Sequence, residues 1–350
     1  MSKNQNEEKL TLYRKYRPQD FSEVVGQEHI TEVLKGEIEN GRLAHAYLFC
    51  GSRGTGKTSV ARILAHAVGC AGSDLYEIDA ASYTGVDNIR ELNENISTLP
   101  FESKYKVYIF DEVHMLSKGA FNAFLKTLEE PPAHVIFILA TTEFGKVPET
   151  IVSRCQTFIF KKPSQKMLKT VVLNIAKKEG FTLEPAAADL VAFLADGSFR
   201  DAQSILQKII SSSADKKISL EEISLVTGAP RAGLVNDLLT AIEKKDLVAG
   251  LNTIEQVFAN NIDGEVYLKL LLQKIRFTLM LRNAPALTAT IKEQLPEEDF
   301  AFLKDLADTG KNINSALLSQ ALDTAHTLAT SSWPQMILEL LVLKLIGEQK

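Results

Sequence analysis

A short segment rich in glycine carries the residues of this chain that are best suited to chemistry. Its residues are Gly51, Ser52, Arg53, Gly54, Thr55, Gly56, Lys57 and Thr58. They fit the pattern G-x-x-x-x-G-K-[ST], between the apolar run AYLFC and the helix-like run TSVARILAHAVG. Glycines let the backbone turn its N–H groups toward phosphate oxygens, and the N-terminus of a following helix adds a favourable dipole. The segment therefore predicts a phosphate-binding loop; a glycine-rich turn without a ligand is the alternative.

The end of the loop and two acidic residues complete the expected site. Lys57 would reach the terminal phosphates, Thr58 would offer its hydroxyl to Mg²⁺, and Ser59 is assigned to the same nucleotide site. Asp111 and Glu112 follow the apolar run KVYIF, where Asp111 can hold Mg²⁺ through water. Glu112 is then placed to polarise the attacking water. The two motifs together predict that the chain binds and hydrolyses ATP.

The elements that must position these residues are indicated by short apolar runs. The runs are AYLFC, LYEID, KVYIFD, HVIFILATT and CQTFIF, and helix-like sequence separates them. This alternation predicts a parallel sheet with crossover helices, an α/β fold. After Pro163 the pattern is helical throughout, so we expect a nucleotide-binding domain at 1–163, a small helical domain at 164–227 and a second helical domain at 228–350.

Composition excludes several other classes. The chain has 350 residues, a net charge of −5 and 45% hydrophobic residues, which is ordinary for a globular protein and speaks against nucleic-acid binding by bulk charge. It contains neither an apolar run of membrane-spanning length nor the apolar core of a signal peptide, so we expect a cytoplasmic protein with no membrane partner. The three cysteines are too few for a four-cysteine zinc site and form no disulfide framework.

Seven segments, in order along the chain, resemble the family of bacterial DNA polymerase III gamma/tau subunits. They read KYRPQDFSEVVGQEHI, GSRGTGKTSVARILA, EIDAAS, KVYIFDEVHMLSKGAFNAFLKTLEEPP, ILATTE, IVSRCQTFIF and GSFRDAQSIL. Archaeal and eukaryotic replication factor C small subunits share the KYRP, VGQ and SRC elements, and the stretch DEVHMLSKGAFNAFLKTLEEPP favours the bacterial subunit. The resemblance implies a P-loop domain of the AAA+ type, a small helical lid and a C-terminal helical collar.

The resemblance also implies roles that spacing alone does not assign. Thr142 matches the sensor 1 residue, and Arg154 matches an arginine finger that acts in trans on the site of an adjacent subunit. Arg200 matches the sensor 2 residue of the lid. Bare sequence would instead suggest a packed threonine and two arginines in ordinary ion pairs.

A strip near the N-terminus resembles the residues that pack around adenine in this family. It comprises Arg17, Pro18 and Val25. Arg90 opens a helix that faces DNA in related loaders, although a solvated helix face explains it equally well. His114 is expected to be structural, because Glu112 already fills the role of base.

One family feature is missing. The usual zinc-binding insert of four cysteines would begin at Cys70, but the chain continues as AVGCAGSDLYEIDAAS without another cysteine. We therefore expect no zinc, and Mg²⁺ held by Thr58 and Asp111 as the metal.

The implied function is that of the ATPase subunit of a clamp loader. Its implied partners are delta, delta-prime and further gamma/tau copies in a hetero-pentameric ring, the sliding clamp and primer–template DNA. ATP would drive clamp opening and loading, without polymerase activity. A different AAA+ remodelling motor and a non-catalytic scaffold subunit are the alternatives. The sequence leaves open whether the chain is a natural short form or part of a longer tau-like protein.

Overall fold

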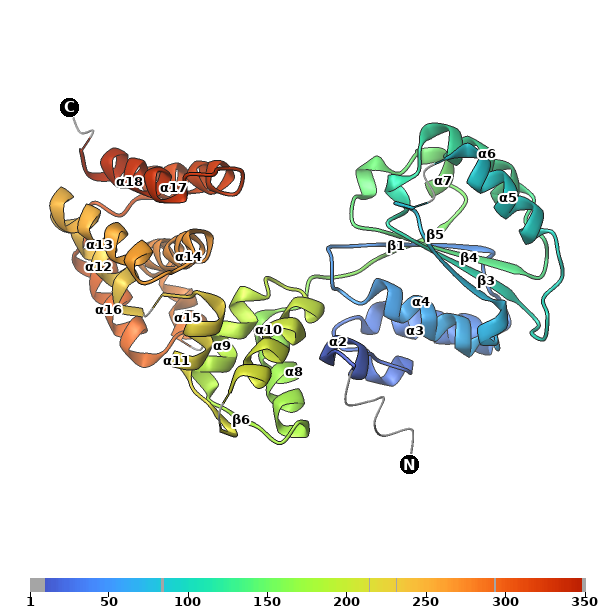
Figure 1. Cartoon of the computed structure of the whole chain (residues 1–350), viewed down its shortest axis with the longest axis horizontal. Helices are drawn as coiled ribbons and strands as arrows, with labels where there is room; N and C mark the ends of the chain where they lie inside the picture. The colour runs from blue at the N-terminus through green and yellow to red at the C-terminus, as the bar shows by residue number, and fades with distance from the viewer. Residues whose placement is uncertain (1–9, 83–84, 214, 231, 293, 348–350) are drawn as a thin grey trace. The chain divides into compact units, whose positions relative to one another are not determined.

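The computed structural model describes residues 10–82, 85–213, 215–230, 232–292 and 294–347 (Figure 1). The chain divides into two compact units. Unit 1 comprises Met1–Ile175 and Ala195–Gln207, and unit 2 comprises Ala176–Leu194 and Lys208–Lys350. The division into three domains at 163 and 227 stays a prediction.

Unit 1 is built on a five-stranded sheet. Its strands are β1 (Ala46–Cys50), β2 (Leu75–Asp79), β3 (Lys106–Asp111), β4 (Val135–Thr141) and β5 (Gln156–Ile159). Their order is β2-β3-β4-β1-β5, and every neighbouring pair is parallel. Each strand falls on one of the five apolar runs, so the prediction of an α/β fold with a parallel sheet is confirmed.

Helices cover both faces of this sheet. The α-helices of unit 1 are α2 (Leu12–Lys15), α3 (Glu28–Glu39), α4 (Lys57–Ala67), α5 (Val86–Ile96), α6 (Lys118–Glu129) and α7 (Glu149–Val152), with the first parts of α8 (Gln165–Lys178) and α10 (Phe199–Ser212). Four short 3₁₀ helices join them: η1 (Phe21–Glu23), η2 (Gly72–Asp74), η3 (Val113–Met115) and η4 (Phe144–Lys146). Helices α5, α6 and α7 lie on one face, and α3 and α4 lie on the other (Figure 1).

Alternating strand residues supply these two faces, which explains why the central strands are apolar without interruption. On the face of α6, Phe124 packs against Phe110 and Phe137 with ring centroids 5.0 and 5.2 Å apart. On the other face, residues such as Ile109 and Ile138 pack toward α3 and α4. A parallel strand buried on both faces needs this continuous apolar pattern.

The carboxyl ends of the three central strands lie at one edge of the sheet. Strand β4 pairs with β1 on one side and with β3 on the other, all in parallel. The residues that follow these strands, Gly51, Glu112 and Thr142, therefore come together at the same edge. In open α/β sheets this edge is where ligands bind.

Unit 2 is almost entirely helical. Its elements are α9 (Pro185–Leu194), α11 (Leu220–Thr227), α12 (Ala232–Lys244), α13 (Leu247–Ala259), α14 (Gly264–Asn283), η5 (Pro285–Leu287), α15 (Thr288–Lys292), α16 (Glu297–Thr309), α17 (Ser315–Leu328), α18 (Pro334–Val342), the π-helical turn η6 (Leu343–Gly347) and the two-residue strands β6 (Thr182–Leu183) and β7 (Lys217–Ile218). The short parallel β6–β7 pair is an addition to the expected all-helical pattern, since two residues are too few to produce a strand signal.

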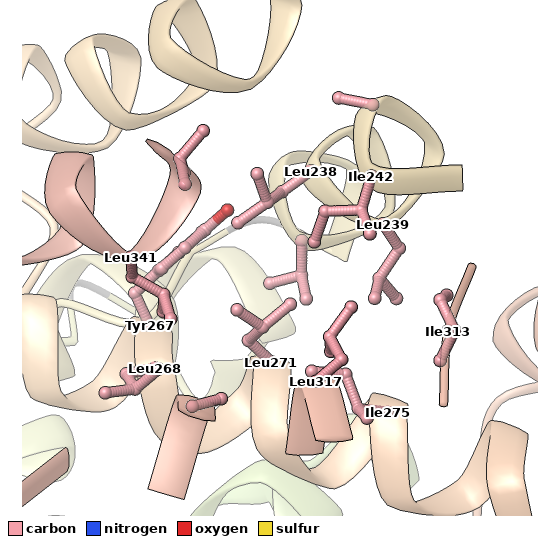
Figure 2. Close-up of a cluster of buried hydrophobic side chains, with 14 of the residues drawn as sticks. Leu238, Leu239, Ile242, Tyr267, Leu268, Leu271, Ile275, Ile313, Leu317 and Leu341 are labelled. Atoms are coloured by element: carbon pink, nitrogen blue, oxygen red, sulfur yellow. The ribbon is translucent and has the colours of Figure 1, made fainter. Parts of the chain in front are cut away.

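Helix α14 is the centre of unit 2. Its buried residues include Tyr267, Leu271 and Ile275, which face α12, α17 and α18 in one continuous core (Figure 2). Helix α14 carries apolar residues on more than one face, and these residues are buried against several neighbouring helices. None of the helices in the described part of the chain is long and apolar enough to cross a membrane.

Candidate nucleotide site

The glycine-rich loop leads from β1 directly into α4, as its motif requires. Gly54 and Gly56 have φ angles of 74° and 103°, in the region that favours glycine. Gly54 also approaches the start of α10 closely: a Cβ there would overlap Ser198 Oγ, and the Phe199 N–H donates to the Gly54 carbonyl at 2.9 Å. The loop is thus held on one side by β1 and on the other by Ser198 and Phe199.

Lys57 lies inside this loop. Its side chain is buried, and Nζ donates to the carbonyl oxygens of Gly51 at 2.7 Å and Ser52 at 3.0 Å. Burial lowers the pKa of Lys57, while the nearby carboxylates of Glu112 and Asp111 raise it. The loop therefore surrounds a cation whose hydrogen-bond acceptors are neutral carbonyl groups.

Thr58 and Asp111 meet across the site. The Thr58 hydroxyl donates to Asp111 Oδ2 at 3.1 Å, and the other carboxylate oxygen accepts the N–H of Glu112 at 3.1 Å. A hydroxyl and a carboxylate supply the hard oxygen donors that Mg²⁺ prefers. The residues present therefore fit a magnesium ion, beside a loop that fits phosphate.

Glu112 and Thr142 also form a pair. Glu112 has a φ angle of 50°, a region that residues with a side chain seldom adopt and that is over-represented at active sites. Its Oε2 accepts hydrogen bonds from the Thr142 hydroxyl at 2.8 Å and from the Thr142 N–H at 3.2 Å. The residues predicted to activate water and to sense the terminal phosphate are thus in direct contact.

The strip expected around adenine is linked to the same loop through the neighbouring Gln27, whose amide donates to the Thr55 carbonyl at 3.5 Å. Arg17 and Pro18 are half-buried, and Val25 is 43% exposed. The neighbouring Gln27 is buried, and its amide bonds both the N–H and the carbonyl of Lys161, at 3.0 and 2.8 Å. Gln27 therefore fixes the strip to the segment after β5, while the assignment of this strip to adenine stays a prediction.

Cationic side chains gather beside α4. Burial lowers the pKa of Arg17, and the charges of Arg62, Arg14 and Arg200 lower it further, against the opposing effect of Glu77. Arg200 itself lies over the ring of Tyr13, 4.9 Å from the ring centroid. Like charges held this closely favour the arrival of an anion such as a nucleotide.

Arg154 makes its hydrogen bonds and its ion pair with a different set of residues. It follows α7, and it pairs with Glu129 of α6 at 2.5 Å and with the Thr150 carbonyl at 2.7 Å. To act on the nucleotide of a neighbouring subunit, the Arg154 guanidinium would have to leave Glu129 and bind a phosphate instead.

The predicted DNA contact of Arg90 stays a prediction. Arg90 falls in α5, but its side chain lies outside the described residues.

The environment of Cys70 bears on the expected lack of zinc. Cys70 is buried, and burial raises the pKa of its thiol, which disfavours the thiolate that a metal needs. Within the described residues, no group of three or more His, Cys, Asp and Glu side chains could hold a metal ion. The absence of zinc stays a prediction.

Sequence reasoning missed two residues that contact the site, Ser198 and Tyr13, and named a third, His114, only as a structural residue. Ser198 contacts Gly54, Tyr13 receives Arg200, and His114 contacts Glu112. Ser198 and Tyr13 are close in sequence to segments already singled out, but nothing local indicates their partners. His114 and Glu112 are two residues apart, but the further contacts of His114 with Thr141 and Glu143 depend on the end of β4, which only the sheet brings near.

Comparison with solved structures identifies the fold of the chain. The chain is similar to the solved structure of the Thermotoga maritima RuvB Holliday junction branch migration motor, with a TM-score of 0.53 and 20% identity over 65% of this chain and 79% of that one. At this identity the likeness establishes the fold alone, a parallel five-stranded α/β domain that resembles the AAA+ fold of that motor. The prediction of that fold is thereby confirmed.

Sequence comparison establishes the family. A family model described as DNA polymerase III, delta subunit, matches residues 26–83 and 73–164, and one described as DNA polymerase III subunits gamma and tau domain III matches residues 218–350. The Bacillus subtilis DNA polymerase III subunit tau is 41% identical over 315 residues, which are 84% of this chain and 56% of that protein. For the Mycobacterium tuberculosis (H37Rv) subunit gamma/tau, the identity is 34% over 364 residues, with 96% of this chain and 62% of that protein covered. The chain belongs to the gamma/tau family of DNA polymerase III, and it spans roughly three-fifths of the length of these relatives.

Proposed function

We propose that this chain is the ATPase subunit of a DNA polymerase III clamp loader, and that it binds and hydrolyses Mg²⁺-ATP in the site described above. The observation that carries the proposal is the convergence of Lys57, the Thr58–Asp111 pair and the Glu112–Thr142 pair at the carboxyl edge of one parallel sheet. Membership of the gamma/tau family supports the clamp-loading role. Because the chain spans only part of its relatives, both the activity and the partners are proposals.

The residues of this chain would divide the work as follows. Loop N–H groups and Lys57 bind the phosphates, while Thr58 and Asp111 would hold Mg²⁺, which neutralises phosphate charge when bound. Glu112 accepts a proton from the attacking water, and Thr142 orients Glu112 through its two hydrogen bonds. Arg17, Pro18 and Val25 would line the base, with Arg200 near the phosphates.

An arginine from an adjacent subunit would complete the set of groups that stabilise the transition state. Arg154 would leave Glu129 and stabilise the developing charge on the phosphates bound by an adjacent subunit. ATP would thus be shared between neighbours in a hetero-pentameric ring with delta, delta-prime and further gamma/tau copies, and the helical region from residue 228 onward would join the subunits.

The expected work is mechanical. ATP binding would tighten the ring around an open sliding clamp and admit primer–template DNA, and hydrolysis would release the clamp closed on DNA. No bond of the DNA changes, so polymerisation would belong to another chain.

ATP turnover with and without the clamp and primed DNA tests this proposal. The assembled chain should turn over ATP faster when both are added together. Stimulation by neither would indicate a remodelling motor instead, and absence of turnover in every assembly would indicate a scaffold subunit. Either result would refute the proposal.

The shared site has its own test. A mixture of subunits carrying Lys57→Ala with subunits carrying Arg154→Ala should recover activity at those interfaces that pair an intact loop with an intact arginine. A mixture no more active than either variant alone would remove the support for action in trans.

A further inference from the structure

The inference concerns His114, whose two ring nitrogens both face acidic or hydroxyl oxygen atoms. It lies in η3, two residues after Glu112, and its side chain is 6% exposed. Nδ1 is 3.0 Å from Thr141 Oγ1 and 3.4 Å from Glu112 Oε2, and Nε2 is 3.3 Å from Glu143 Oε1. A histidine that merely fills space needs no such match at each nitrogen.

The contact with Glu112 adds to those of Thr142. The Thr142 hydroxyl and N–H both donate to Oε2, and Nδ1 of His114 approaches the same oxygen. The contacts made by described residues thus gather on one oxygen of the carboxylate. This leaves Oε1 as the oxygen available to a water molecule.

The other side of the ring is held by the end of β4. Nε2 lies within ion-pair distance of Glu143 Oε1, a residue that follows β4 directly. Glu143 is fixed in turn by Lys146, whose Nζ lies 2.8 Å from Oε2, and by its own N–H, which donates to Thr141 Oγ1 at 3.0 Å. His114 is therefore clamped between Glu143 and the Glu112 carboxylate.

We propose that His114 is a positioning residue that keeps the Glu112 carboxylate turned so that Oε1 faces the attacking water. The physical reason is that a glutamate side chain has several rotatable bonds, and a misplacement of about 1 Å can lower a rate by about 100-fold. Thr142 restrains Oε2 from one side, and His114 prevents its movement on the other. This inference rests on the proposed ATPase function.

The test compares three substitutions of His114 in the assembly in which the unaltered chain hydrolyses ATP. His114→Asn places an amide near the position of Nδ1, and His114→Gln places one near Nε2. His114→Ala removes both contacts. Steady-state kcat and KM for ATP are measured for each, with direct binding of Mg²⁺-ATP and thermal unfolding.

We expect His114→Ala to lower kcat by about 10- to 100-fold, with an ATP dissociation constant within about twofold of the unaltered value. Asparagine should restore more of kcat than glutamine, because only asparagine can reach Glu112. An unchanged kcat for alanine, a loss confined to ATP binding, or equal rescue by both amides would overturn the inference. If the unaltered chain has no turnover, the proposed function fails instead.

Two controls separate positioning from folding. His134→Ala removes another histidine of unit 1, one whose ring bonds the exposed carbonyl of Thr98, and it should leave kcat unchanged. Thr141→Val keeps the shape of a buried strand residue but removes the hydroxyl at Nδ1, so it reports on the clamp even if His114→Ala does not fold. Thr141→Val should lower kcat by about three- to tenfold. An unchanged kcat for this variant would contradict the proposal that His114 is held in place to position Glu112.

Discussion

Lys57 of unit 1 and Lys274 of unit 2, two of the buried lysines among the described residues, show how the same side chain serves two purposes. Lys57 in the phosphate loop is 6% exposed and Lys274 in α14 is 5% exposed, and burial lowers the pKa of both. Their acceptors differ. Lys57 donates to two backbone carbonyls, whereas Lys274 donates to the carboxylate of Asp299 at 2.7 Å and to the amide oxygen of Asn236 at 2.8 Å.

The difference lies in whether the charge is already neutralised. Asp299 is itself almost buried, so the Lys274 pair is complete and ties α14 to α16, with Asn236 adding α12. The carbonyl partners of Lys57 carry no net charge, so its ammonium group can transfer to phosphate oxygens without breaking an ion pair. A buried cation without a direct counter-ion is costly, and this cost is what an arriving anion relieves.

The largest expected effect follows from Lys57→Met. We expect ATP turnover to fall by about 1000-fold, because a charge directed at the phosphates is lost. The free energy of unfolding should change by less than about 1 kcal/mol, because only neutral carbonyl groups lose a partner. Turnover and urea unfolding together measure both; a large loss of stability would show that Lys57 is structural.

The matched substitution Lys274→Met should do the opposite. It leaves the Asp299 carboxylate buried and unpaired, which should lower the free energy of unfolding of the chain by about 3 kcal/mol. Urea unfolding of the double variant with Asp299→Asn should recover part of this loss, since the uncompensated charge is then gone. An unchanged free energy of unfolding for Lys274→Met would mean that the Lys274–Asp299 pair does not stabilise the fold. Lys57 and Lys274 would then not differ in their structural role.

A smaller effect is expected where the loop touches α10. Gly54→Ala combines a positive φ with a clash against Ser198, and should cost about 2 kcal/mol of stability or of ATP binding. Gly36→Ala, in α3 where an added Cβ meets open space, is the control and should be neutral or stabilising. Calorimetric unfolding with and without ATP separates a loss of stability from a loss of ATP binding. Equal stability and ATP binding of Gly54→Ala and Gly36→Ala would argue against a close approach of Gly54 to Ser198.

The smallest effect concerns a cation that, unlike Lys57, does have a carboxylate partner. Glu129→Gln removes the partner of Arg154, and the pair is partly exposed, so its release is worth at most about 1 kcal/mol. We expect ATP turnover of the assembled ring to rise by about two- to fivefold. Glu130→Gln, one residue away, changes the same charge and should have no effect; a fall in turnover for Glu129→Gln would show that the pair supports the arginine rather than restraining it.

Local patterns accounted for much of the fold. The runs AYLFC and KVYIFD became β1 and β3, because a strand buried on both faces needs an unbroken apolar sequence. Their order in the sheet was not predictable, since each run would fit any central position. The pair β6–β7 was missed for a different reason: its two-residue strands are defined only by their pairing.

The candidate site shows the same division. Lys57 and Thr58 were found because their spacing along the chain is itself the motif, and Asp111 and Glu112 because they end a recognisable strand. The contacts of Gly54 with Ser198 and of His114 with Glu143 join segments distant in sequence. No local signal predicts such partners.

The amino-acid sequence alone determined the alternation of strands and helices, the phosphate loop and the family resemblance, because these depend on residue types at short, fixed separations. Only the tertiary structure decided which side chains restrain Glu112, which carboxylate holds Arg154, and why the charge of Lys274 is neutralised by a carboxylate while that of Lys57 is not. Those outcomes depend on which strands become neighbours and on how deeply each group is buried, and both are properties of the packed chain as a whole.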